Sequence, residues 1–212
     1  MNNNEVKISN YYVPFNYARN KLKSLNPHDI SNSSGIFFDE FNNHFIIHIC
    51  GDIYFVTYPN GNIFTMDGDI SSKLDMNIII IRYLINAKGI PNTNKFITFK
   101  EVPGGNVYYN NFLNRTIKRL STEFVNSIDN YIKVMENLGA QKVSMGDLSY
   151  KFSFLGNTSM IFILWFGDDE FKPNANILFD SSIIYYFNTE DLAVIPDIAM
   201  DIIAKNINSL PK

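Results

Sequence analysis

Carboxylate side chains gather in the stretch that follows the only tryptophan of the chain, Trp165. Three consecutive acids, Asp168–Glu170, come directly after an apolar run, and Asp180 comes at the end of the next one. Carboxylate oxygens are the ligands that Mg²⁺ and Ca²⁺ prefer, so one hypothesis is a divalent-metal-dependent enzyme that uses these acids. The spacing does not match an EF-hand loop, and no histidine accompanies it. A solvated turn, or an ion pair with Arg115 or Arg82, explains the same residues without a metal.

Basic and acidic residues are segregated along the chain. Positions 82–119 hold seven bases and one acid, Glu101, whereas positions 165–201 hold eight acids and one base, Lys172. A fold that brings the two blocks together would pair them internally or line a polar cleft with them. If the fold keeps them apart, both blocks are ordinary solvated faces, because exposed ion pairs contribute little stability.

A Gly-Gly turn lies within the basic block. Gly104 and Gly105 follow Pro103 and precede Tyr108 and Arg115. Such a turn allows close backbone approach and could hold an anion beside the arginine. It is neither a P-loop nor a dinucleotide fingerprint, and a tight turn that starts a helix is the alternative interpretation.

These features together predict a polar cleft between the Tyr108–Arg115 segment and the Trp165–Asp180 segment, with a small anionic ligand or a partner protein bound in it. The residues that we expect to bind the ligand are Glu101, Gly104, Gly105, Tyr108, Arg115, Trp165, Asp168, Glu170 and Asp180.

Histidine and cysteine offer weaker candidates for chemistry. His44 and His48 share one face of an expected strand but lie ~13 Å apart along it, too far to chelate one metal ion unaided. Cys50 is the only cysteine, so the chain provides no disulfide, Cys-based zinc site or iron–sulfur site. His48 and Cys50 lie ~6.6 Å apart along the strand, which argues against their acting as a Cys–His nucleophilic pair and leaves a histidine distant in sequence as the alternative partner.

Composition indicates a folded, soluble chain of about one domain. It has 212 residues, 46% of them hydrophobic, 18% charged, and a net charge of −3. Mild acidity argues against a nucleic-acid binder, which normally has a basic surplus. The N-terminus lacks the features of a signal peptide, and the longest apolar run, Ile78–Ile81, cannot span a bilayer. We therefore expect a cytoplasmic protein that does not associate with membranes.

Sequence patterns predict helices and two groups of strands. Turn pairs such as Asn60-Gly61 separate the strands of the first group. The pairs Gly146-Asp147 and Gly156-Asn157 separate those of the second. The expected helices are Tyr11–Leu25, ended by Asn26-Pro27, then Ser72–Lys88, Asn110–Leu120, 121–138 and Thr189–Ile207 with Thr189 as its cap. The expected strands are Gly35–Phe41, His44–Cys50, Ile53–Tyr58, Asn62–Met66, Phe96–Val102, Gln141–Met145, Tyr150–Leu155, Ser159–Phe166 and Asn176–Phe179.

This order of elements predicts an α+β fold rather than an alternating parallel one. We expect a flexible N-terminus over residues 1–10 and a single domain over residues 11–212, with two antiparallel β-meanders packed against helices. The 72–88 helix is apolar around nearly its whole circumference, so it is expected to be the buried central helix. Phe45, Ile47 and Ile49 share one strand face and are expected in the core.

Several strings together resemble one family, DUF3786, a domain of unknown function found in uncharacterised proteins of anaerobic bacteria and archaea. The strings are Tyr83-Leu84, Ala87-Lys88-Gly89 with Pro91, Phe99 to Glu101 with Pro103-Gly104-Gly105, Tyr108/Tyr109 with Phe112 and Arg115, Leu164-Trp165 with Asp168, Glu170 and Phe171, Ile177 to Ser181, and Thr189 to Asp191. The resemblance covers most of the chain and implies no reaction. Some relatives carry a cysteine-rich iron–sulfur segment, which this chain lacks.

Three hypotheses about function follow. The first is a non-enzymatic binding or accessory module that uses the expected cleft. The second is the metal-dependent enzyme, in which Mg²⁺ or Ca²⁺ is the cofactor. The third is a structural or oligomerising domain whose strand edges pair between chains. The sequence does not indicate the oligomeric state.

Overall fold

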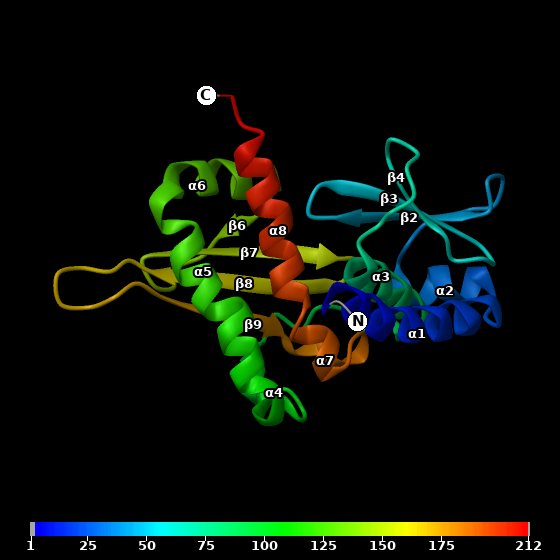
Figure 1. Ribbon diagram of the computed structural model, residues 1–212, viewed down its shortest axis with the longest axis horizontal. Helices are drawn as coiled ribbons and strands as arrows, with labels where there is room; N and C mark the ends of the chain where they lie inside the picture. The colour runs from blue at the N-terminus through cyan, green and yellow to red at the C-terminus, as the bar shows by residue number, and fades with distance from the viewer. Residues whose placement is uncertain (1–2, 212) are drawn as a thin grey trace. The chain divides into compact units, whose positions relative to one another are not determined.

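The computed structural model describes residues 3–211, and these divide into two compact units (Figure 1). Unit 1 contains the residues up to 91 together with two short later segments, Leu155–Asn157 and Tyr185–Phe187. Unit 2 contains the rest of the described chain. Each unit is therefore assembled from segments that are separated in the sequence.

Unit 1 contains the first predicted meander. Its elements are α1 (Asn3–Lys23), α2 (Pro27–Ser34), β1 (Phe38–Asp39), β2 (His44–Ile49), β3 (Asp52–Thr57), β4 (Ile63–Thr65) and α3 (Leu74–Asn86). The strands pair antiparallel in the order β4–β3–β2, with β1 also paired to β2. Phe45, Ile47 and Ile49 have no exposed surface, so the predicted core face is confirmed.

Helix α3 forms the centre of unit 1, as predicted, with Met76–Ile81 all buried. At its end, the Tyr83 hydroxyl donates to the Ser34 carbonyl at 2.8 Å and accepts from the Asn157 backbone N–H at 3.0 Å. The Tyr83 ring stacks on Tyr186 with 5.3 Å between centroids. A Cβ at Gly156 would lie 2.0 Å from the Tyr83 hydroxyl, so this close approach requires glycine.

The start of the chain differs from the prediction. Helix α1 begins at Asn3 rather than Tyr11, and residues 1 and 2 of the expected flexible terminus lie outside the described residues. Asn26-Pro27, expected only to end a helix, also begins α2. The Asn26 side chain accepts from the His28 backbone N–H at 2.8 Å, and proline fits the first helical position because that position needs no N–H donor.

Unit 2 contains the second predicted meander. Its elements are β5 (Phe96–Thr98), α4 (Gly105–Phe112), α5 (Lys118–Glu123), α6 (Ile128–Asn137), β6 (Gln141–Lys142), β7 (Leu148–Leu155, whose last residue belongs to unit 1), β8 (Thr158–Trp165), β9 (Asn174–Asp180), α7 (Thr189–Leu192) and α8 (Ile195–Asn208). The strands are ordered β7–β8–β9–β5, with β6 beside β7. The α+β class with two antiparallel meanders is thus confirmed.

Strand β8 is the buried central strand that its apolar sequence predicts, with Thr158–Leu164 buried and only its end exposed. Boundaries elsewhere in unit 2 differ. The expected strand Phe96–Val102 is β5 followed by a 3₁₀ turn, Phe99–Glu101. The expected helix Asn110–Leu120 begins earlier, as α4, and reaches α5 through a π turn, Leu113–Ile117.

The last two helices also begin differently. Asn188, not Thr189, caps α7 in a capping box with Asp191. The expected helix Thr189–Ile207 is divided into α7 and α8, and Pro196 stands in the first turn of α8, a position that proline favours. Across residues 3–211, no helix combines the length and apolarity that a membrane span requires.

Candidate functional site

The β8–β9 hairpin separates the acids that were expected to act together. Trp165 on β8 pairs with Asn174 on β9, so Asp168–Glu170 lie in the loop at that end. Asp180 is the last residue of β9, six positions beyond Asn174, which is ~20 Å along the strand at ~3.3 Å per residue. Within residues 3–211, no group of three or more acidic, histidine or cysteine side chains is placed to hold a metal ion. The four carboxylates therefore do not form one site.

The Asp180 carboxylate connects the end of β9 to the loop before β5. Its side chain is fully buried and accepts hydrogen bonds from the backbone N–H groups of Thr93, Asn94 and Ser182 at 2.7–3.0 Å, and from the Thr93 and Ser182 hydroxyls. Burial alone raises the pKa of a carboxyl, but the bonds from Ser182 and Thr93 outweigh it and hold the pKa of Asp180 below its usual range. This carboxylate fixes the loop before β5.

Asp168 organises the exposed loop between β8 and β9. Its carboxylate accepts from the backbone N–H groups of Phe171 at 2.7 Å and Glu170 at 2.9 Å, and these bonds lower its pKa. Trp165 and Glu170, the other predicted residues here, are exposed. The geometry is that of a solvated turn with a side-chain-to-backbone bond.

The predicted residues of the Gly-Gly turn have structural partners. Glu101 accepts from the Thr98 N–H and hydroxyl, both at 2.7 Å, which closes the 3₁₀ turn and lowers the pKa of Glu101. Gly104 has a φ of +79°, and a Cβ on Gly105 would lie 1.9 Å from the Phe99 carbonyl oxygen. Both glycines are therefore required by the backbone of this turn.

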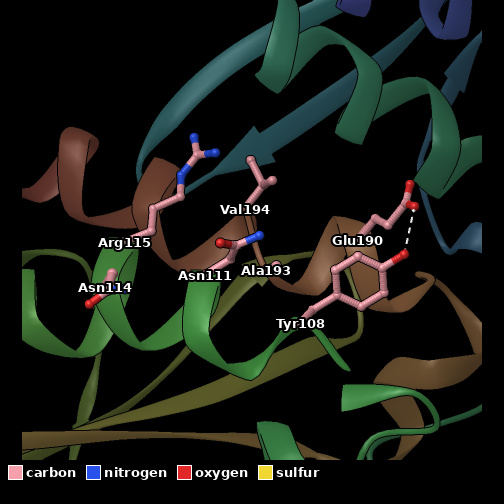
Figure 2. Close-up of a pocket in the computed structure, with 7 residues that line it drawn as sticks. All are labelled: Tyr108, Asn111, Asn114, Arg115, Glu190, Ala193 and Val194. Atoms are coloured by element: carbon pink, nitrogen blue, oxygen red, sulfur yellow. Dashed lines mark hydrogen bonds between the residues drawn. The ribbon is translucent and has the colours of Figure 1, made fainter. Parts of the chain in front are cut away.

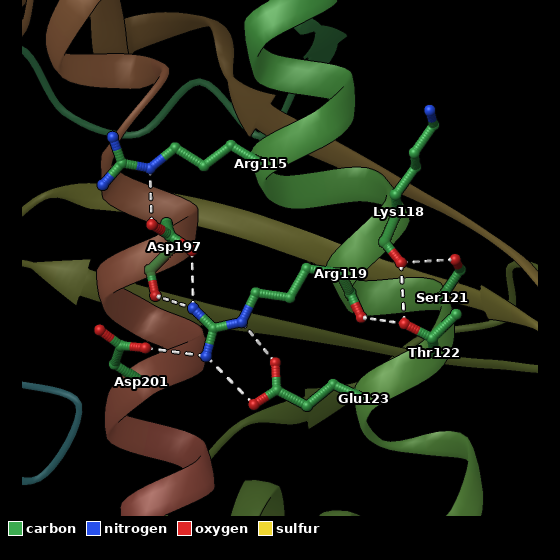
Figure 3. Close-up of polar contacts among 8 residues, drawn as sticks. All are labelled: Arg115, Lys118, Arg119, Ser121, Thr122, Glu123, Asp197 and Asp201. Atoms are coloured by element: carbon green, nitrogen blue, oxygen red, sulfur yellow. Dashed lines mark hydrogen bonds and ion pairs between the residues drawn. The ribbon is translucent and has the colours of Figure 1, made fainter.

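Arg115 pairs with a carboxylate that the sequence interpretation did not assign to it. Its Nε lies 2.6 Å from the Asp197 carboxylate on α8. Arg119, one turn later, contacts the other oxygen of Asp197 at 2.6 Å, Asp201 at 2.8 Å, and Glu123 (Figure 3). Part of the basic block thus pairs with part of the acidic block, inside unit 2.

This cluster favours a permanently charged Arg119. Partial burial alone lowers the pKa of the guanidinium, but hydrogen bonds to Glu123, Asp197 and Asp201 raise it above its ordinary value. Asp197 bridges two arginines and is itself only 18% exposed. It therefore fixes the guanidinium of Arg115 at the edge of a pocket.

The pocket has a volume of about 500 Å³ and lies wholly within unit 2 (Figure 2). Its lining residues are Tyr108, Asn111, Asn114, Arg115, Glu190, Ala193 and Val194. Of the residues predicted from the sequence, Tyr108 and Arg115 line it. None of the predicted residues between Trp165 and Asp180 does; the opposite wall is α7 and the turn after it.

Local structure explains why these side chains meet. Tyr108, Asn111 and Arg115 are spaced i, i+3 and i+7 and so share one helical stripe. On the other wall, Glu190 and Val194 are four residues apart, about one helical turn, so both can face the pocket. A helical-stripe analysis of the 108–115 segment would have found Asn111, whereas Asn114 and the residues of α7 and the following turn depend on tertiary packing.

Two bonds anchor α7 to the loop and helix that face it. The Thr189 hydroxyl donates to the Pro103 carbonyl at 2.6 Å, and the Tyr108 hydroxyl donates to the Glu190 carboxylate at 3.1 Å. The bond to Glu190 raises the pKa of Tyr108, so this phenol stays protonated at neutral pH. The wall is therefore held in place without a ligand.

The pocket carries opposite charges at its two ends. Arg115 and Tyr108 are seven residues apart, which corresponds to ~10 Å along a helix, and Glu190 lies at the Tyr108 end. Figure 2 shows Asn111, Ala193 and Val194 between them. The middle therefore offers apolar surface and an amide, and the charged groups stand at the ends.

Comparison with known proteins gives one match. No curated protein and no solved structure matches the chain. A family model described as a domain of unknown function, DUF3786, matches residues 26–201, which is more than half of the chain and includes residues of both units. The resemblance inferred from the sequence strings is confirmed, and the chain belongs to the DUF3786 family.

Proposed function

We propose that the protein is a non-enzymatic binding module whose unit 2 holds a small zwitterionic molecule with an apolar body, such as an aliphatic amino acid or a short apolar peptide. One observation carries the proposal: a pocket of about 500 Å³ has an arginine at one end, a glutamate at the other and apolar side chains between. That volume lies within the range of small-molecule sites.

Electrostatics favours a zwitterion over a simple anion. Asp197 already compensates the charge of Arg115, and Glu190 adds a negative charge to the lining. A ligand with only anionic groups would gain from Arg115 but be repelled at the Glu190 end. A carboxylate near Arg115 and an ammonium group near Glu190 satisfy both ends.

The central part of the pocket suits an aliphatic side chain with a polar backbone. Ala193 and Val194 offer apolar contact, and the amides of Asn111 and Asn114 offer donors and acceptors. A small apolar group buried there contributes ~0.8 kcal/mol per CH₂.

The lining supports binding rather than catalysis. The described lining residues include no histidine, cysteine, serine or lysine, and Glu190, the carboxylate among them that could act as a base, is already bonded to Tyr108. Tyr108, like any tyrosine, is protonated at neutral pH, and its bond to Glu190 raises its pKa further, so it is a poor base there.

The test is isothermal titration of the full chain with leucine, leucyl-leucine and N-acetyl-leucine, which lacks the ammonium charge. We expect Glu190→Gln to weaken binding of the zwitterions roughly tenfold and to leave binding of N-acetyl-leucine unchanged or improved. Glu170→Gln is the matched control, because Glu170 is exposed in the β8–β9 loop and does not line the pocket. Absence of saturable binding, or equal effects of the two variants, contradicts the proposal.

A further inference from the structure

Unit 1 has a second pocket, of about 450 Å³, in a part of the chain that carries no predicted site residue. Its lining residues are Asn16, Arg19, Asn20, Lys23, Pro59 and Asn60. Four of them come from α1, drawn in blue in Figure 1, and two from the turn between β3 and β4.

The α1 residues form one polar stripe, because their spacing of i, i+3, i+4 and i+7 places them on one face of the helix. The helix presents its other face to the core of unit 1, where Phe15, Ala18 and Leu22 are buried. The core contacts therefore fix the rotation of α1, and this rotation aims the polar stripe at the turn.

Neutral groups hold Arg19 in place. Its Nε donates to the Asn60 carbonyl at 2.7 Å and its Nη2 donates to the Asn62 side-chain oxygen at 2.8 Å. Its guanidinium also lies 5.5 Å from the centre of the Phe15 ring. These contacts orient the guanidinium without adding a negative charge, so its positive charge is preserved at the pocket.

Lys23 adds a second positive charge one turn further along α1. Like charges at i and i+4 repel each other on a helix, and none of the six lining residues is an acid. Cations near a helix C-terminus do offset the helix dipole, and Lys21 and Lys23 both do so. Arg19 lies one turn further from that end, so the helix dipole stabilises its charge less. An anion bound in the pocket would offset the repulsion between Arg19 and Lys23.

The turn that closes the pocket is fixed before any ligand arrives. Gly61 N–H donates to the Thr57 carbonyl at 2.6 Å, and the Tyr58 hydroxyl donates to the Leu25 carbonyl at 2.8 Å, just beyond the end of α1. A Cβ on Gly61 would lie 3.1 Å from Cγ of Arg19, so the turn lies directly against the helix.

From these observations we infer that unit 1 binds a phosphorylated, hydroxyl-rich small molecule such as a sugar phosphate. Arg19 and Lys23 match the charge of a phosphate group and can donate several hydrogen bonds to its oxygens. The amides of Asn16 and Asn20 can both donate to and accept from hydroxyl groups. The mostly polar lining suits a sugar better than an apolar body.

The experiment is isothermal titration of the full chain with glucose 6-phosphate and with glucose. We expect saturable binding of glucose 6-phosphate and none of glucose. Lys23→Gln should weaken the binding of glucose 6-phosphate about tenfold or more, because a hydrogen-bonded charge pair is lost.

The matched control is Lys21→Gln, which removes the same charge from the same helix. Lys21 lies outside the pocket and donates to the Asn86 side chain at 3.3 Å, so its removal should change the affinity less than about twofold. Absence of saturable glucose 6-phosphate binding overturns the inference. Equal weakening by the two substitutions also overturns it, because general attraction by a basic helix would then explain the result.

Discussion

Two arginines stand at two pockets, and the group that holds each one differs in charge. In unit 2, Arg115 is held by the Asp197 carboxylate at 2.6 Å. In unit 1, Arg19 is held at 2.7–2.8 Å by a backbone carbonyl and an amide oxygen. Both guanidinium groups are positioned by the protein, Arg115 by a carboxylate and Arg19 by two neutral acceptors.

The difference separates two roles that one residue type can serve. An arginine paired with a carboxylate offers a ligand its shape and donors, with the charge already compensated. An arginine held by neutral acceptors offers its charge as well. The partner of the arginine therefore has to be known before a ligand class is assigned.

Asp180 lines neither pocket, and its buried carboxylate stabilises the fold. Asp180→Asn should lower the free energy of unfolding by about 3 kcal/mol, because buried donors lose their acceptor. It should leave the binding of leucine and of glucose 6-phosphate unchanged. Urea unfolding and isothermal titration measure the two effects. Altered binding at either pocket would contradict a purely structural role for Asp180.

The stabilisation that the Asp180 carboxylate provides should depend on pH. The pKa of Asp180 is lower in the folded protein than the usual value, so the stabilisation is fully present above ~3.9, the pKa of an unfolded aspartate, and is lost as the pH falls through the lower folded value. The stability difference between the original chain and Asp180→Asn should therefore shrink in strong acid. Asp168→Asn, in the exposed loop, is the control and should lower stability far less, because solvent screens this carboxylate and an asparagine oxygen can still accept the same backbone bonds.

Asp197→Asn gives Arg115 a neutral partner like those of Arg19. It should lower stability by about 1–2 kcal/mol, since two arginines lose a largely buried counter-charge. The unit 2 pocket should then bind N-acetyl-leucine several-fold more tightly than the original chain does, as titration can measure.

Asp201→Asn is the control for that change. Asp201 is 54% exposed and contacts Arg119 at 2.8 Å. It should leave the affinity for N-acetyl-leucine as it is. If both substitutions raise that affinity equally, overall charge and not the partner of Arg115 is responsible.

The reciprocal change, Asn62→Asp, places a carboxylate against Arg19. We expect the affinity for glucose 6-phosphate to fall about tenfold, because the positive charge is compensated. Stability should rise by no more than about 0.5 kcal/mol, as is usual for an exposed ion pair. Asn86→Asp places an acid against Lys21 instead, outside the pocket, and should leave the affinity unchanged. Similar losses in both variants would contradict the assignment to this pocket.

Local patterns were enough to predict much of this fold. The alternation of Phe45, Ile47 and Ile49 predicted a core face, and turn pairs such as Asn60-Gly61 predicted the hairpins, because both depend on neighbouring residues alone. Tyr108 and Arg115 were expected at a site because they follow the Gly-Gly turn within the basic block, and both line the unit 2 pocket.

Partners across the fold could not be predicted in this way. Asp168 and Asp180 are near in sequence, yet an antiparallel hairpin places the loop and the far end of its second strand at opposite ends. The pairing of Arg115 with Asp197 depends on how α8 packs beside the π turn Leu113–Ile117, for which no local pattern exists. The polar stripe of α1 can be read from the sequence, but its position beside Pro59 and Asn60 depends on the packing of the helix against the β3–β4 turn.

The two short segments that complete unit 1 determine when this unit can finish folding during translation. A ribosome that has released residues up to 91 has not yet made Leu155, which pairs with Ile49, or Tyr186, which stacks on Tyr83. At roughly 5–20 residues per second, Phe187 follows Pro91 after about 5–20 s. For that interval, helix α3 emerges without part of its aromatic cover, so unit 1 finishes folding only when most of unit 2 has been translated.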